Sequence, residues 1–181
     1  MSTTDFQGPG YTATARALHW LTAVLVITMI VVGLVMANMS GGPTQNLLFN
    51  LHRSTGAVLI PIILYRLLYR MMHPPPPLPD EIPAIQKLAA EGLHWTLYAL
   101  LVAQPIIGWM ATSAYRAPIV VFGLFELPPI APENRAFSEQ AFAVHRVLGI
   151  LLALLIIGHV GAALFHHFVR KDHVLTRMLR G

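Results

Sequence analysis

Four stretches of this chain are apolar over the length that a helix needs to cross a lipid bilayer, and they constrain its fold more than any other feature. They cover about residues 18–36, 47–68, 93–112 and 141–169, and a spanning helix needs about 20 apolar residues. Only 11% of the 181 residues are charged, whereas a soluble domain carries roughly 25%. We therefore predict an all-α integral membrane four-helix bundle. Residues 1–181 form a single domain in this prediction, with spans at about 15–36, 47–71, 88–112 and 139–169.

The basic residues of the connections predict the orientation of the bundle. Eight lie before the first span, between the second and third, or after the fourth: Arg16, Arg66, Arg70, Lys87, Arg170, Lys171, Arg177 and Arg180. Four lie on the other side, Arg53, Arg116, Arg135 and Arg146, together with Glu126, Glu133 and Glu139. Since basic residues are enriched in cytoplasmic loops, we expect both termini in the cytoplasm. The net charge of +4 then records topology, and nucleic acid is not an expected partner.

Two connections have a distinctive composition. The segment HPPPPLPDEIP, residues 73–83, contains too many prolines to be helical. The segment APIVVFGLF, residues 117–125, is apolar but too short to span a bilayer. We expect this second segment to lie in the membrane interface or to cover one end of the bundle.

Histidines inside the apolar stretches indicate the chemistry. His145 and His159 are 14 residues apart in the fourth span, so they share one helix face about 21 Å apart along the axis. With the predicted orientation, His52 lies near His145 at the outer depth and His19 lies near His159 at the inner depth. Two facing imidazoles between apolar helices suit the iron of a six-coordinate haem. The chain has no cysteine, which excludes thiolate-bound clusters and covalently attached c-type haem.

Small residues and arginines near these histidines are consistent with haem. A small residue follows each of the four by one turn: Ala23, Gly56, Gly149 and Ala163. A missing side chain there lets a porphyrin approach the helix backbone. Arg16, Arg53 and Arg146 stand within one turn of the histidines and are candidates to bind the haem propionates. The alternative is that these arginines only set topology and extend toward the membrane surface.

Other assignments of the histidines remain open from sequence. A lone imidazole in a membrane helix can simply hydrogen-bond to a neighbouring helix. His166 lies seven residues after His159 on the same face and is the alternative partner of His19. His94 is disfavoured as a ligand because Tyr98 occupies the position one turn later. His73 and His173 flank loops and are expected to be solvated, and His167 points in another direction.

The sequence contains few residues suited to a transport site or a zinc site. The acidic residues fall in tails, loops or span ends, whereas proton-coupled transport needs ionisable groups within the membrane. Two imidazoles without a carboxylate or thiolate make a poor zinc site. A metal or proton transporter is therefore disfavoured.

Several segments resemble the bacterial cytochrome b561 family of small four-helix dihaem membrane cytochromes. They are YTATARALHWLTAVLVI, LHRSTGAVLIPIILYRLLYRMMHPPPPLP, LHWTLYALLVAQPIIGWM, VFGLFELPP and HVGAALFHHFVRKDHVLTRML. Carried over by position, the family's haem ligands fall on His19, His52, His145 and His159, which favours His159 over His166. Many members carry a further histidine where this chain has Phe142, but that residue is not a haem ligand.

The resemblance implies single-electron transfer in the bacterial inner membrane by two haem b groups. One activity of the family is oxidation of superoxide at the periplasmic face with reduction of ubiquinone. The outer arginines would attract superoxide, although the three outer glutamates leave only a weak positive field. One alternative is an electron-transfer partner of a larger redox complex that has no substrate site of its own. Another is a structural or assembly protein without haem, and oligomeric state stays open.

Overall fold

The computed structural model describes residues 10–180, which form four long helices and a few short elements. The long helices are α1 (Ala13–Ala37), α2 (Pro43–Met72), α3 (Ala84–Ala114) and α4 (Arg135–Phe165). A π-helical turn, η1 (His166–Arg170), continues α4, and a short helix, α5 (Thr176–Leu179), follows. The strands β1 (Val120–Val121) and β2 (Phe125–Glu126) lie between α3 and α4. The predicted all-α four-helix fold is confirmed, while this strand pair was not predicted.

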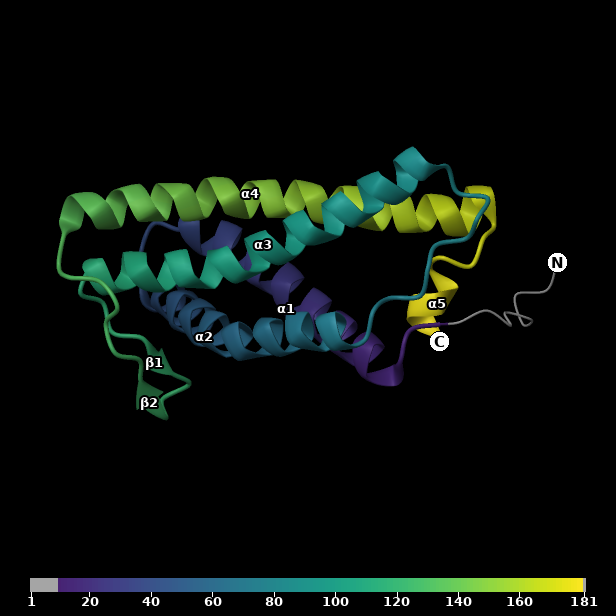
Figure 1. The fold of residues 1–181 in the computed structure, drawn as a ribbon. Helices are drawn as coiled ribbons and strands as arrows, with labels where there is room; N and C mark the ends of the chain where they lie inside the picture. The colour runs from purple at the N-terminus through teal and green to yellow at the C-terminus, as the bar shows by residue number, and fades with distance from the viewer. Residues whose placement is uncertain (1–9, 181) are drawn as a thin grey trace.

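The helices pack in chain order, α1 on α2, α2 on α3 and α3 on α4 (Figure 1). α3 changes direction part-way along, as a helix with an internal proline such as Pro105 does. The β1–β2 hairpin and α5 lie at opposite ends of the bundle. We call the hairpin end the outer end and the α5 end the inner end, following the predicted orientation.

Local chemistry explains where the helices begin. The Thr12 hydroxyl accepts a hydrogen bond from the Ala15 amide at 3.2 Å at the start of α1. The Asn134 side-chain oxygen accepts one from the Phe137 amide at 3.0 Å at the start of α4. Both are typical helix caps, because they satisfy amides that have no partner within the helix. Pro43 occupies the first turn of α2, where its missing N–H costs nothing.

All four long helices are long and apolar enough to cross a membrane, with the fourth span counted from Arg135 to Arg170. Their outward surfaces are apolar as well: Leu154 and Ile157 on α4 are 61% and 67% exposed. In a bilayer these side chains face lipid tails, so their exposure costs little. Each helix is longer than its apolar stretch; α3, for example, begins at Ala84, within the polar sequence that precedes its apolar run.

The buried core is an apolar layer at the middle of the bundle. It consists of Val26, Leu59, Ile63, Leu100, Leu101 and Leu152. Three of these residues stand seven positions from a histidine: Val26 from His19, Leu59 from His52, and Leu152 from both His145 and His159. Seven residues rise about 10 Å in a helix. The apolar layer therefore lies two turns from the histidines at either end.

The apolar segment after α3 forms a hairpin that is attached to α2. Val120 pairs with Glu126 and Val121 with Phe125. The turn between the strands has positive φ at Phe122 (47°) and Gly123 (77°), as in the tight turns that favour glycine. The Ser54 hydroxyl donates to the Val120 carbonyl and accepts from the Phe122 amide, both at 3.1 Å. The hairpin thus packs on α2 at the outer end.

We predict that Ser54→Ala loosens this hairpin while the helix bundle stays folded. The change leaves the Phe122 amide and the Val120 carbonyl without a protein partner, and each such bond contributes roughly 0.5–1.5 kcal/mol. Hydrogen exchange at the Phe122 amide should become about tenfold faster. Ser40→Ala is the matched control, because Ser40 is exposed in the connection between α1 and α2. Unchanged exchange at Phe122 would contradict the role given to Ser54.

Candidate functional site

The outer end of the bundle brings together one histidine from α2 and one from α4. The ring centroids of His52 and His145 are 6.2 Å apart, with the ring planes at 81°. Both residues were predicted to meet at this depth, and the structure brings them together. Both side chains are half-buried within the bundle.

The inner end holds a second pair, from α1 and α4. The ring centroids of His19 and His159 are also 6.2 Å apart, and the planes are tilted by 56°. His159, and not His166, is therefore the α4 histidine that faces His19. His166 instead contacts Asp172, with 2.5 Å between Nδ1 and the carboxylate oxygen.

The separation within each pair fits two imidazoles bound on opposite sides of one metal ion. An imidazole nitrogen binds a first-row metal at about 2 Å, so two opposed nitrogens are about 4 Å apart and the ring centroids about 6 to 6.5 Å apart. The observed value is 6.2 Å in both pairs. Within residues 10–180 no group of three or more histidine, cysteine or acidic side chains is placed to hold a bare ion. A pair of imidazoles suits an iron whose other four ligands come from a macrocycle.

Hydrogen bonds with Gln104 favour the tautomer of His145 that can bind a metal. Its Nδ1 lies 3.1 Å from the Gln104 carbonyl oxygen and donates to it, and the Gln104 side-chain amide donates to the His145 carbonyl at 3.1 Å. A proton on Nδ1 leaves the lone pair of Nε2 free to bind a metal. Gln104 was not identified from the sequence, and its role is visible only where α3 crosses α4.

His52 is half-buried, and one of its polar atoms has no partner among the described residues. Its Nδ1 is shielded from solvent and has no hydrogen-bond partner in the part of the chain that the structure describes. A buried polar atom without a partner is costly. A metal bound at Nε2 would leave this Nδ1 protonated and still without a partner, so the atom does not by itself indicate a haem.

Glycines on the two other helices make room for the outer pair. A Cβ atom on Gly33 of α1 would lie 3.3 Å from Cε1 of His52, and one on Gly108 of α3 would lie 3.2 Å from Cε1 of His145. Both distances are tighter than ordinary contacts, so larger residues would push the rings. The sequence does not distinguish these glycines from Gly158, whose Cβ would meet nothing within 4 Å.

The two glycines that were predicted to contact haem have protein neighbours in the structure. A Cβ atom on Gly149 would lie 3.2 Å from the Gln104 side-chain nitrogen, and one on Gly56 would lie 3.6 Å from the terminal methyl group of Met29. Gly149 therefore gives space to Gln104, the partner of His145. Contact of either glycine with haem stays a prediction.

A third histidine lies at the inner end. The ring of His94, on α3, is centred 5.3 Å from that of His159, closer than the ring of His19. The presence of Tyr98 one turn later had disfavoured His94, yet Tyr98 is occupied elsewhere, under the guanidinium of Arg66 at 5.2 Å. His94 is thus adjacent to the inner pair through its contact with His159.

Arg66 is a further inner residue that sequence reasoning counted only as a loop charge. One of its guanidinium nitrogens lies 2.8 Å from His19 Nδ1 and donates to it. With Nδ1 accepting, the proton of a neutral His19 ring is on Nε2, and metal binding at Nε2 would require that proton to leave Nε2. If the proton moves to Nδ1, the Arg66 guanidinium has to turn away.

The remaining histidines lie outside both pairs. His73 is exposed and stacks on Tyr69 at 4.1 Å, while His167 packs edge-on against Phe168 at 4.8 Å. His173 is half-buried, so it is less exposed than His73. Its position follows from the C-terminal segment folding back onto the bundle.

The three arginines predicted to bind propionates have different surroundings. Arg53 donates to the Phe49 and Pro118 carbonyls and to Asn50, at 3.2, 3.1 and 2.9 Å, so it fastens the outer loop to α2. Arg16 has a buried nitrogen, Nη1, that lacks a hydrogen-bond partner among the described residues. Arg146 lines a surface groove of about 520 Å³ beside the outer part of α4.

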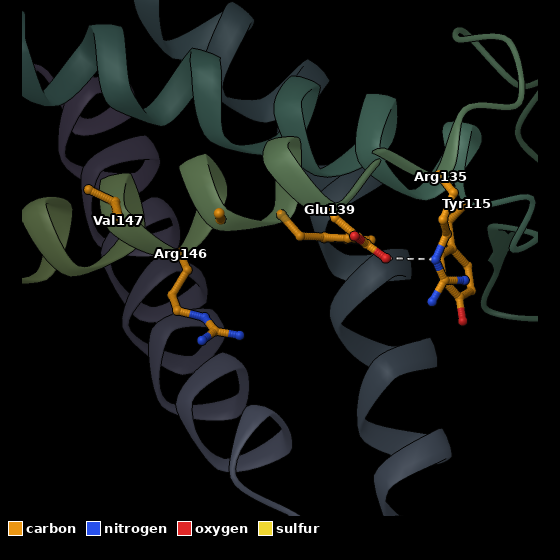
Figure 2. Close-up of a pocket in the computed structure, with 7 residues that line it drawn as sticks. Tyr115, Arg135, Glu139, Arg146 and Val147 are labelled. Atoms are coloured by element: carbon orange, nitrogen blue, oxygen red, sulfur yellow. Dashed lines mark hydrogen bonds and ion pairs between the residues drawn. The ribbon is translucent and has the colours of Figure 1, made fainter. Parts of the chain in front are cut away.

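Arginine and aromatic side chains line this groove (Figure 2). The Arg135 guanidinium lies over the Tyr115 ring at 4.4 Å and pairs with Glu139 at 2.9 Å. Arg116, near the groove, pairs with Glu133 at 3.3 Å. Arg146 lies further along α4 and has no ion pair within residues 10–180 (Figure 2). It is therefore the outer arginine whose charge is most available to an anion.

Known proteins match this chain over nearly its whole length. The family model described as prokaryotic cytochrome b561 matches residues 10–181. "Cytochrome b561 homolog 2" of Escherichia coli (strain K12) is 37% identical, over 93% of this chain and 90% of that protein. "Probable superoxide oxidase CybB" of Yersinia pestis is 31% identical, over 93% and 95%. "Cytochrome b562" of Cereibacter sphaeroides is 28% identical, over 96% and 98%.

These matches identify the family and agree with the apolar helices. A family match over residues 10–181 implies haem b binding and a role in electron transfer. With four helices long and apolar enough to span a bilayer, the chain is a multi-pass bacterial membrane protein. It belongs to the prokaryotic cytochrome b561 family.

Proposed function

We propose that this protein is a dihaem cytochrome that carries single electrons between the periplasmic face and the quinone pool of the bacterial inner membrane. His52 and His145 would hold the outer haem b, and His19 and His159 the inner one. The observation that carries this proposal is the equal 6.2 Å separation of the two imidazole pairs at opposite ends of one bundle. A bound haem supplies an iron that accepts and releases one electron at a time.

The protein's own part is to position the histidines and keep water away from them. Gln104 fixes the proton of His145 on Nδ1, and Gly33 and Gly108 let the outer rings lie close to the neighbouring helices. The layer around Leu59, Ile63 and Leu152 separates the two ends. Because this layer is apolar and closely packed, it favours neither charged groups nor water between the pairs.

We propose superoxide as the electron donor and ubiquinone as the acceptor. In this reaction two superoxide anions lose one electron each and leave as dioxygen, while one quinone takes up two electrons and two protons to become quinol. The name of the Yersinia pestis relative, a probable superoxide oxidase, supports this choice. Arg146 would attract the anion to the outer end, since its charge has no acidic partner among the described residues.

An electron-transfer cytochrome without its own substrate site is the second candidate. The ion pairs Arg116–Glu133 and Arg135–Glu139 favour it, because paired charges leave only a weak field for attracting anions. The two candidates differ in what reduces the haem. Rapid reduction by superoxide supports the first, and reduction by quinol or a protein donor alone supports the second.

We predict that His52→Ala and His145→Ala each remove one haem and leave about half of the wild-type haem absorbance, because one imidazole is a weak substitute for two. His19→Ala and His159→Ala should give the same loss at the inner site. A pyridine haemochrome assay on purified protein measures the haem-to-protein ratio. His73→Ala is the control and should keep full haem, since His73 is exposed and stacked on Tyr69. Full haem content in all four variants would rule out these ligands.

We further predict that Arg146→Gln slows superoxide-driven quinone reduction by about threefold or more at low ionic strength, because it removes a cation that attracts the substrate. The difference from wild type should shrink at high salt, where charges are screened. Lys87→Gln is the matched control, since it removes the same charge from the first turn of α3, at the inner end. Equal rates in Arg146→Gln and wild type at low salt would remove Arg146 from substrate attraction.

A further inference from the structure

The C-terminal helix α5 closes the inner end of the bundle. The Trp20 indole on α1 donates to the Met178 carbonyl at 3.2 Å. The Tyr11 amide donates to the Arg177 carbonyl at 3.4 Å. Both bonds join the start of α1 to α5, which Figure 1 shows beside the beginning of the described chain. α5 therefore has a defined position near His19.

Arg177 is buried there with unused donors. Its side chain is 4% exposed, and Nε and Nη2 have no hydrogen-bond partner among residues 10–180. The sequence analysis counted Arg177 only among the basic residues after the fourth span, and its burial was not predicted. An arginine stays charged at any relevant pH, and a buried charge without a partner is strongly unfavourable. These unused donors point to an anion that the protein does not itself supply.

A second arginine with a shielded donor lies at the same end. Arg16 precedes His19 by three residues on α1, and its Nη1 is buried without a partner in the described chain. Three residues rise about 4.5 Å along a helix, so Arg16 stands about one turn from the inner histidine pair. Asp172, an acidic residue of the C-terminal segment, is already bound to His166. No carboxylate of residues 10–180 forms an ion pair with Arg16 or Arg177.

We infer that Arg177 and Arg16 bind a propionate carboxylate of the inner haem, with α5 acting as the clamp that presents Arg177. This inference rests on the proposed inner haem between His19 and His159. A carboxylate matches the donors of a guanidinium and forms strong charge-assisted hydrogen bonds with it. The anion is assigned to the cofactor and not to a lipid, because Arg177 is only 4% exposed and its segment is hydrogen-bonded to Tyr11 and Trp20, on either side of His19 in the sequence.

Replacement of Arg177 tests the assignment by redox titration and haem retention in the full-length protein in lipid vesicles. Arg177→Gln should weaken retention of the inner haem by about tenfold, as for loss of one charge-assisted bond. It should also lower the inner haem's reduction potential, because a nearby cation favours the reduced iron. The outer haem should be unaffected. Arg180→Gln, an exposed arginine at the end of α5, should change neither property.

Two further experiments identify the anion that Arg177 binds. The full chain is reconstituted with haem dimethyl ester, whose propionates carry no charge; the difference between wild type and Arg177→Gln should then disappear. The comparison is repeated in vesicles of phosphatidylcholine alone and in vesicles that also contain phosphatidylglycerol. An effect of Arg177→Gln only with the anionic lipid would assign the site to a lipid phosphate and overturn the inference.

The remaining outcomes separate this inference from the proposed function. Wild-type protein that binds no haem would defeat both. Two haems in the wild type, with an inner haem unchanged by Arg177→Gln, would defeat the inference alone. If Arg177→Gln does not fold, Arg177→Lys provides the test, because it keeps the charge but loses the paired donors. A partial loss of retention with Arg177→Lys supports the assignment, and full retention overturns it.

Discussion

The structure depends on two pairs of imidazole rings, one at each end of the apolar bundle, with 6.2 Å between ring centroids each time. In our proposal each pair binds one iron, whose other four ligands come from a flat macrocycle. The other features are arranged around these pairs: the proton fixed on His145 by Gln104, the glycines beside the outer rings, and the apolar layer between the ends.

The helical fold could be predicted because the bilayer limits the alternatives. Backbone groups in lipid must satisfy one another, so an apolar stretch of sufficient length has to be a helix. The hairpin could not be predicted, since strands of two residues leave no periodic pattern and are held by Ser54 from a distant helix. The position of α5 could not be predicted either. In sequence Arg177 resembles any loop charge, and only the tertiary structure buries it.

The histidine pairs followed from depth in the membrane together with the family resemblance, which favoured His159 over His166 as the partner of His19. His94 and Arg66 were missed as neighbours of the inner pair for a different reason. Their contacts depend on how α2 and α3 are rotated about their axes, which hydrophobicity defines poorly when nearly every face is apolar. Gly33 and Gly108 were missed because a glycine in close contact and one facing open space look alike in sequence.

The account depends on how many haems one chain holds, since the transfer of electrons from one face to the other requires both histidine pairs to be filled. The most direct measurement is the haem-to-protein ratio of wild-type protein from haem-replete cells, with protein determined by amino-acid analysis. The account predicts two haem b groups per chain. One haem or none, in protein that is correctly inserted and folded, would contradict it.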